Sequence, residues 1–355
     1  MNTTSLRPVG WAPEGGAQPA ARVSRPLLAL GLGVLAVTLL ATALGSLFLG
    51  SRSIGIDVVV QALVHYDPAN DDHVVILTSR LPRMLAGLGV GAALGVAGAV
   101  MQGVVRNPLG DPGLLGVNAG AALAVVCAIG FLGIGNASGY VWFAFAGAAL
   151  VALLVYAVGS LGRDGATPVK LALAGAAVSA ALTSVTTAVL LTDAATFDQF
   201  RFWTVGALTG RKLELVGRLA PFLVVGLVVA LCTGRALNVL SLGDDVARAL
   251  GQRVGRTRGV VAASAVVLCG AATALAGPIP FVGLVAPHAA RLVTGPDYRW
   301  ILPYSAVLAP LLLLLADVLG RLVARPGEVQ VGIVLAFVGA PFLILLIRRR
   351  RLLEL

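Results

Sequence analysis

The chain has 355 residues, of which 58% are hydrophobic and 12% charged, whereas a soluble domain keeps roughly a quarter of its residues charged. This composition excludes an ordinary soluble protein, because the apolar residues form blocks long enough for a bilayer, which takes about 20 helical residues. The net charge of +10 does not indicate nucleic-acid binding, since the arginines lie between apolar blocks and at the C-terminus, with no basic helix carrying interleaved aromatic residues.

The N-terminal stretch 1–26 is rich in Pro, Gly and Ala, which predicts a flexible cytoplasmic tail. The first apolar block, 27–49, is longer than the roughly 7–15 residues of a signal-peptide core, so we expect a retained span. Nine further blocks follow, at 84–105, 114–134, 139–161, 169–192, 213–233, 259–276, 279–295, 300–324 and 329–347. The sequence therefore predicts an all-α polytopic membrane protein with about ten transmembrane helices in one domain over 27–347.

Positive charge predicts the orientation of these spans. Arg22 and Arg25 precede the first block, and a run of four arginines, 348–351, follows the last. Because arginine accumulates in cytoplasmic loops, both termini are expected in the cytoplasm, with 348–355 as a basic tail. The segment 234–258 holds five arginines and falls on the same side. The predicted location is the bacterial inner membrane.

Small residues recur every four positions in the second block, at Gly87, Gly91, Gly95, Ala99 and Gly103. At that spacing they form one ridge on a helix. Such ridges let helix backbones approach closely in lipid, so we expect tight packing here, with glycine flexibility for gating as the alternative.

Two segments between spans carry distinctive patterns. Residues 106–116 contain two prolines and three glycines, which predicts a tight cytoplasmic corner. Residues 242–251 predict a short amphipathic helix, because acidic residues stand at its N-terminal end and glycine at its C-terminal end. This helix and the basic stretch 252–258, part of a cytoplasmic coupling segment expected over 240–258, would form a docking surface for a soluble partner.

The sequence resembles the FecCD family of ABC permeases, the type that includes vitamin B12 and ferric-siderophore importers. The resemblance covers about residues 79–350 and rests on motifs that occur in the family's order. They are Arg80-Leu81-Pro82-Arg83, Gly98-Ala99-Val100-Met101-Gln102, Arg106-Asn107-Pro108-Leu109 with Asp111-Pro112, Leu242-Gly243 through Gly251, Gly277-Pro278-Ile279 with Phe281 to Val285 and Pro287-His288, Ala316-Asp317, and Gly339-Ala340-Pro341.

The resemblance implies a type II ABC importer permease fold that pairs with a second permease subunit, as a homodimer or with a paralogue, around a central path. Two ATPase subunits would use ATP and Mg, with no cofactor in this chain, and an extracytoplasmic substrate-binding protein would deliver cargo. It also implies ATPase coupling by a set of residues in the short helix. These are Gly243, Asp244, Asp245, Ala247, Arg248 and Gly251.

The family's docking arginines for the binding protein would fall on Arg80, Arg83 and Arg321. For Arg321 a structural pair with Asp317, four residues earlier on one helix, is an equal alternative. The last outer loop departs from the family pattern, because Glu328-Val329 is followed by Gln330 and not by proline.

The segment 196–208 combines aromatic and charged residues and predicts a short interfacial helix. By resemblance this helix lies near the mouth of the translocation path, which the fifth span lines. The path residues implied are Ser179, Thr183, Thr187, Phe197 and Trp203.

No metal site is predicted. Cys127, Cys232 and Cys269 lie in apolar runs without a CxxC neighbour, so we expect packing roles. His65 and His73 lie in an outer loop with three aspartates, where solvated charge is favoured over a surface metal site.

The chain is not expected to be an enzyme, because neither Lys170 nor Lys212 follows the glycine that a Walker loop needs, and no catalytic cluster is visible. An ion-driven secondary transporter is the alternative, but that class usually has charged or unwound sites at mid-membrane, and here the span centres lack acids apart from Asp317. A membrane enzyme ranks last. Ferric siderophores are the expected cargo, followed by haem and cobalamin and then molybdate.

Overall fold

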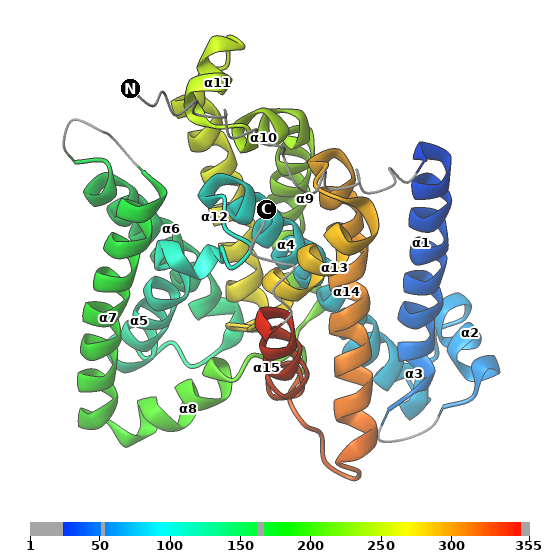
Figure 1. Ribbon diagram of the computed structural model, residues 1–355. Coiled ribbons are helices and arrows are strands. Elements are labelled where there is room, and N and C mark those ends of the chain that lie inside the picture. Colours follow the sequence, from blue (N-terminus) through cyan, green and yellow to red (C-terminus); the bar gives the residue numbers. More distant parts are fainter. Residues whose placement is uncertain (1–23, 51–53, 162–166, 349–355) are drawn as a thin grey trace, which may run out of the picture.

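The computed structural model describes residues 24–50, 54–161 and 167–348, and every regular element in these ranges is a helix (Figure 1). The predicted tails fall almost wholly outside the described residues. The elements are α1 (Arg25–Phe48), α2 (Ile56–Val64), α3 (Asp71–Val75), the π-helical turn η1 (Ile76–Arg80), α4 (Leu81–Val105), the 3-10 turn η2 (Pro112–Leu115), α5 (Val117–Gly130), α6 (Ala137–Gly159), α7 (Pro168–Thr192), α8 (Ala194–Thr204), α9 (Leu213–Cys232), α10 (Gly234–Ser241), α11 (Asp244–Ala249), α12 (Val254–Ala276), α13 (Val282–Thr294), α14 (Tyr298–Val323) and α15 (Val331–Arg348).

Each of the ten predicted apolar blocks corresponds to a helix. Seven helical stretches of the described chain are long and apolar enough to cross a membrane. One is the continuous stretch Asp71–Val105, which contains α3, η1 and α4, and the other six are α1, α6, α7, α9, α12 and α14. Helices α5 and α15 are shorter apolar helices, and α13 has 13 residues with Pro287 inside it. The predicted all-helical polytopic fold is confirmed.

Helix α4 lies in the middle of the molecule and contacts α9, α12, α13 and α14 (Figure 1). Its predicted ridge of small residues makes these contacts possible. A Cβ atom on Gly91 would overlap the backbone of Pro310, and one on Gly95 would lie 2.6 Å from the carbonyl oxygen of Ser305 in the same helix, α14. The interpretation of the ridge as a close-packing surface is confirmed.

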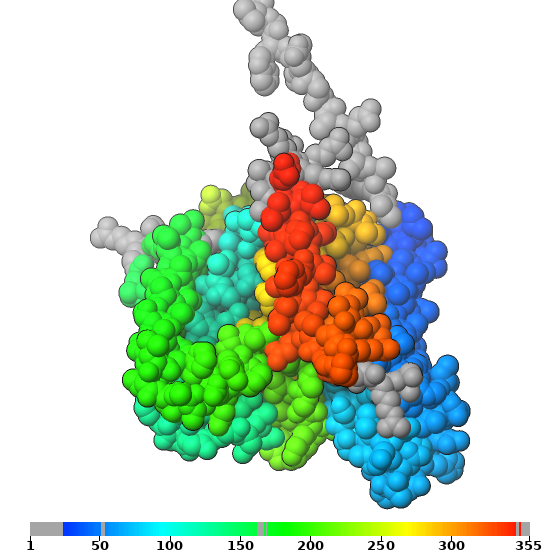
Figure 2. All heavy atoms as spheres, turned by 90° about the horizontal axis from the view of Figure 1, so that it is seen from below, coloured from blue at the N-terminus to red at the C-terminus, as the bar shows by residue number. Residues whose placement is uncertain are grey.

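The other helices flank this centre in two groups. Helices α5, α6 and α7 pack on one another at one side, while α1 packs on α14 at the opposite side, with α2 and α3 beside its C-terminal end (Figure 1). Helix α15 crosses the middle of one face and contacts α13 and α14 (Figure 2). Helices α7 and α15 both have large apolar side chains that are exposed in the single chain, among them Leu173 and Phe337.

The segment 106–116 forms more than the predicted corner. After an exposed turn at Arg106 the chain enters the protein, so that Pro112 and Leu115 of η2 are buried. The turn starts with Asp111, whose side chain accepts a hydrogen bond from the Gly113 amide at 2.7 Å. A Cβ atom on Gly175 of α7 would overlap the Leu114 carbonyl oxygen, which shows how tightly η2 packs. The prolines and glycines therefore shape an internal contact as well as a turn.

Candidate functional site

The predicted amphipathic helix is α11, which projects with α10 at one end of the molecule (Figure 1). Three apolar side chains near it are exposed: Leu242 by 61%, Val246 by 46% and Leu250 by 63%. Ala247 on the other face is fully buried and fixes α11 to the protein. Apolar side chains presented at a projecting end, with charged neighbours, are typical of a protein interaction surface.

Asp244 at the start of α11 is bound by arginines from two other parts of the chain. Its Oδ1 accepts a hydrogen bond from the Arg258 guanidinium of α12 at 2.9 Å and another from Arg106, which precedes η2. Arg248, one turn further along α11, lies 3.8 Å from the same carboxylate and pairs with Asp245 at 2.9 Å. We call Arg106, Asp244, Arg248 and Arg258 the α11 charge cluster. It links α11 to α12 and to the segment before η2.

The electrostatics of Asp244 follow from these neighbours. Partial burial alone would raise its pKa, but the positive charges of Arg258 and Arg106 outweigh this effect and hold the pKa below its ordinary value. The carboxylate is therefore ionised at neutral pH and keeps both arginines in place.

One glycine precedes α11 and another follows it, and the backbone at both has a positive φ. Gly243 has φ 110° and Gly251 has φ 81°, a region that side chains other than glycine rarely adopt. After Gly251 the chain is held by Gln252, whose side-chain amide donates to the Ala236 carbonyl of α10 at 3.1 Å and to the Thr257 hydroxyl at 3.2 Å. The stretch 252–258, with Gln252 and Arg258, was predicted as part of this surface, but Arg106 was not, because its partner Asp244 is 138 residues away in the sequence.

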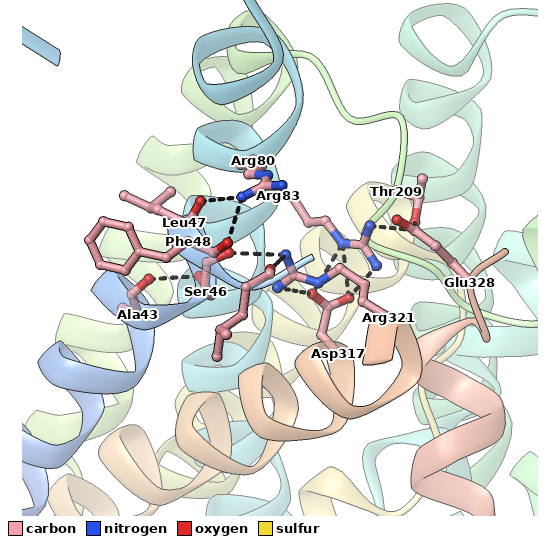
Figure 3. A network of polar contacts seen from close by, with 11 residues as sticks. Ala43, Ser46, Leu47, Phe48, Arg80, Arg83, Thr209, Asp317, Arg321 and Glu328 are labelled. Carbon is pink, nitrogen blue, oxygen red and sulfur yellow. Dashed lines mark hydrogen bonds and ion pairs between the residues drawn. The ribbon is translucent and has the colours of Figure 1, made fainter. Parts of the chain in front are cut away.

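A second charged group lies at the other end of α4, where it meets α14 (Figure 3). The Arg83 guanidinium donates to both carboxylate oxygens of Asp317 at 2.8–3.0 Å and to Glu328 at 2.6 Å. Asp317 also pairs with Arg321 at 3.0 Å, which confirms the predicted pair four residues apart. With Arg80, these residues form what we call the α4–α14 charge network. One carboxylate, 1% exposed, thus pairs with two buried arginines, and Glu328 supplies a second negative charge.

The network also binds the C-terminal end of α1, whose last carbonyls have no partner within that helix. Arg80 donates to the carbonyls of Leu47 and Phe48 at 2.6 and 3.0 Å, and Arg321 donates to those of Ser46 and Leu49 at 3.0 and 2.7 Å (Figure 3). A positive guanidinium there also stabilises the negative end of the helix dipole.

The three predicted docking arginines are buried and do not form an exposed surface. Arg80, Arg83 and Arg321 are only 7%, 5% and 3% exposed, and their guanidinium groups contact the chain itself. Their structural role is therefore observed directly, while docking stays a prediction. Glu328 belongs to the same network although its loop departs from the family pattern, and its side chain is 31% exposed.

The predicted path residues divide between an exposed face and the core. Thr183, Thr187 and Phe197 are exposed on α7 and α8, and Ser179 is half-buried. Trp203 is 2% exposed and stacks on Phe200 with ring centroids 5.5 Å apart, so its ring faces the protein interior. It packs there because α8 is amphipathic and buries one side against α5.

The α11 charge cluster and the α4–α14 charge network lie at opposite ends of an all-helical protein whose described residues include seven helices able to cross a membrane, which is the architecture of an integral membrane protein. Comparison with known proteins gives the family: residues 38–349 match the FecCD transport family, and the chain belongs to this family. The resemblance deduced from the motifs is thereby confirmed.

Several relatives are similar over most of their length. The chain is 47% identical to the ferric enterobactin transport system permease protein FepD of Escherichia coli (strain K12), over 90% of this chain and 94% of that one. It is 44% identical to the iron(3+)-hydroxamate import system permease protein FhuB of Bacillus subtilis (strain 168), over 86% and 79%, and 41% identical to the cobalamin import system permease protein BtuC of Halobacterium salinarum, over 78% and 74%. A solved structure described as an inward-facing ABC transporter of metal-chelate type superposes with a TM-score of 0.79 at 28% identity, covering 91% of this chain and 99% of that one.

Proposed function

We propose that this chain is the membrane-spanning subunit of an ATP-driven importer for ferric siderophores, working with ATPase subunits and a substrate-binding protein. The single observation that carries the proposal is α11, a short projecting helix that exposes Leu242, Val246 and Leu250 around a charged turn. A partner that binds this helix can move α12 and the segment before η2, because Asp244 joins them through Arg258 and Arg106.

The end of the molecule that carries α10 and α11 faces the cytoplasm in this proposal, with both termini on that side. Arginine supports it, since Arg235, Arg253 and Arg256 are exposed at this end and α1 begins there at Arg25 (Figure 1). The α4–α14 charge network then lies at the extracytoplasmic end. A binding protein docks beside it, where Glu328 and Lys212 are accessible and the buried arginines Arg80, Arg83 and Arg321 set the local charge.

A second permease subunit covers the exposed apolar faces of α7 and α15, and the path runs between the two copies. Thr183 and Thr187 give the exposed face of α7 a mildly polar character. Ferric siderophores are the first choice of cargo because the relatives named for ferric enterobactin and iron(3+)-hydroxamate are 47% and 44% identical, compared with 41% for the relative named for cobalamin. Haem and cobalamin follow. An ion-driven mechanism gains no support, because Asp317 is neutralised by Arg83 and Arg321.

The test is uptake of iron-labelled catecholate and hydroxamate siderophores, haem and cobalamin in a strain that lacks the chain, with and without the gene restored. The native chain should rescue uptake of a siderophore. Gly251→Arg should fold and fail to rescue, because an arginine at φ 81° distorts the turn that the ATPase contacts. Gly133→Arg is the matched control: it has φ 66° and equally open surroundings, but lies between α5 and α6, outside both α11 and the residues proposed for docking.

Equal uptake by the Gly251 and Gly133 variants would contradict coupling through α11. Unchanged uptake of every cargo after deletion would remove the siderophore assignment and leave the family membership intact.

A further inference from the structure

A groove of about 430 Å³ opens between the last turn of α9, the start of α10 and the first two turns of α12. Its walls are mostly apolar side chains, with two arginines at one end. The lining residues are Val228, Val229, Cys232, Thr233, Ala236, Arg253, Arg256, Thr257 and Val260. Since α9 and α12 are both membrane-spanning helices that end here, the groove lies where the hydrocarbon of the bilayer meets its polar surface.

Charge and depth are ordered along this groove. Seven residues of α12 separate Arg253 from Val260, which at 1.5 Å per residue places the valine about 10 Å deeper toward the bilayer centre. On α9, Val228 likewise precedes Cys232 by one turn. The arginines therefore mark the polar end, and the exposed valines mark the hydrocarbon end. This order of a cation followed by apolar walls matches a phospholipid, whose phosphate lies outside its acyl chains.

The two arginines are available for a ligand. In the ranges that the structure describes, neither Arg253 nor Arg256 makes a hydrogen bond or ion pair, and both are exposed, whereas the neighbouring Arg258 is held by Asp244. Two adjacent guanidinium groups without a carboxylate partner attract an anion and favour phosphate, which they bind through paired N–H groups.

We infer that this groove binds an anionic phospholipid, such as phosphatidylglycerol, in the leaflet on the α10–α11 side. Arg253 and Arg256 bind the headgroup phosphate, and Val228, Val229 and Val260 contact an acyl chain. The inference needs the chain to span a membrane and does not depend on the cargo or on the ATPase. An acidic side chain of a protein partner would satisfy the arginines but would leave the valine walls of the groove uncovered in the bilayer, which favours the lipid.

The test uses the full chain in detergent and in nanodiscs. Native mass spectrometry with mixed phosphatidylglycerol and phosphatidylcholine should show preferential retention of the anionic lipid. Because each arginine near a membrane contributes about 1 kcal/mol toward anionic lipid, Arg253→Gln or Arg256→Gln should weaken its binding about fivefold and the double variant about thirtyfold. Arg235→Gln is the matched control, because Arg235 is exposed on α10 at the same end but does not line the groove.

Cys232 supplies a native probe inside the groove. Its thiol is exposed and free, so its alkylation rate should be lower in phosphatidylglycerol nanodiscs than in phosphatidylcholine nanodiscs, and this difference should vanish in the double variant. Val260→Trp, which fills the apolar end without altering charge, should also reduce lipid binding while the unfolding temperature stays near the native value.

Three results would overturn the inference. Equal losses for Arg235→Gln and the groove variants would mean general charge attraction. Displacement of the lipid by soluble glycerol phosphate at similar concentrations would mean an anion site without acyl recognition. Protection of Cys232 by a co-purified protein in phosphatidylcholine nanodiscs, without protection by phosphatidylglycerol, would assign the groove to a partner.

Discussion

The α4–α14 charge network and the α11 charge cluster use the same chemistry in different surroundings. In each, one aspartate joins several arginines from separate helices. Asp317 is 1% exposed, whereas the side chain of Asp244 is 25% exposed. A buried carboxylate that pairs with two cations cannot be removed without leaving unpaired charge in the protein, while an exposed one can exchange its partners for water. The first arrangement fixes helices, and the second can change when a partner binds.

The largest effect is expected from Asp317→Ala. Arg83 and Arg321 would stay buried without their shared counter-charge, so we expect a loss of about 3–5 kcal/mol in the free energy of unfolding. Thermal unfolding of the purified protein measures it. Asp198→Ala is the control, because its pair with Arg201 is exposed and should change stability by less than about 1 kcal/mol. Similar losses in both variants would refute the distinction between buried and exposed pairs.

A smaller loss is expected when α4 and α14 are pushed apart. Gly91→Ala places a Cβ atom against the Pro310 backbone, and such overpacking costs about 1–3 kcal/mol. Since Arg83 and Asp317 sit on the same two helices, their pair should loosen as well. Gly259→Ala in α12 is the matched control, because its Cβ atom meets open space and alanine favours a helix. Unfolding temperatures that fall equally in both variants would show that the close contact is unimportant.

Asp244→Asn separates stability from function. Because the carboxylate is partly solvated, we expect a change of less than about 1 kcal/mol in stability. Siderophore uptake should fall much more, since α11 loses its links to Arg106 and Arg258. Uptake and unfolding temperature measured on the same variant check this. Normal uptake at native expression would show that the α11 charge cluster does not transmit motion.

The smallest effect concerns Asp297, which precedes α14 and accepts a hydrogen bond from Asn238 of α10 at 2.6 Å. The hydrogen bond with Arg299 lowers the pKa of Asp297 most. Partial burial opposes this effect and the hydrogen bond with Asn238 adds to it, so that the pKa is about 2. A depressed pKa contributes stability that is fully present above the ordinary value near 3.8 and is lost as pH falls through the folded-state value of about 2. Asp297→Asn should therefore lower stability slightly at pH 5 and by a smaller amount at pH 2. Equal differences at both values would contradict this linkage.

How much the sequence predicts differs between these regions. Composition and the length of the apolar blocks predicted the helical membrane fold, because hydropathy alone decides which segments enter a bilayer. The acidic start and glycine end of α11 predicted a short helix, since capping preferences are local. The pair of Asp317 with Arg321 was accessible for the same reason, being four residues apart on one helix.

Contacts between remote residues required the tertiary structure. Arg83 and Glu328 are 245 residues apart, and Arg106 and Asp244 are 138 apart, so neither pair has a sequence signal. The three predicted docking arginines stood beside spans in the sequence, and only packing showed that all three are buried, Arg80 and Arg321 against the end of α1 and Arg83 against Asp317. The inward course of η2 was likewise decided by its fit against α7. The sequence by itself determined which segments are helices and which of them are apolar, because those properties depend on neighbours along the chain. The tertiary structure decided which charges meet and which are buried, because those properties depend on how the helices pack.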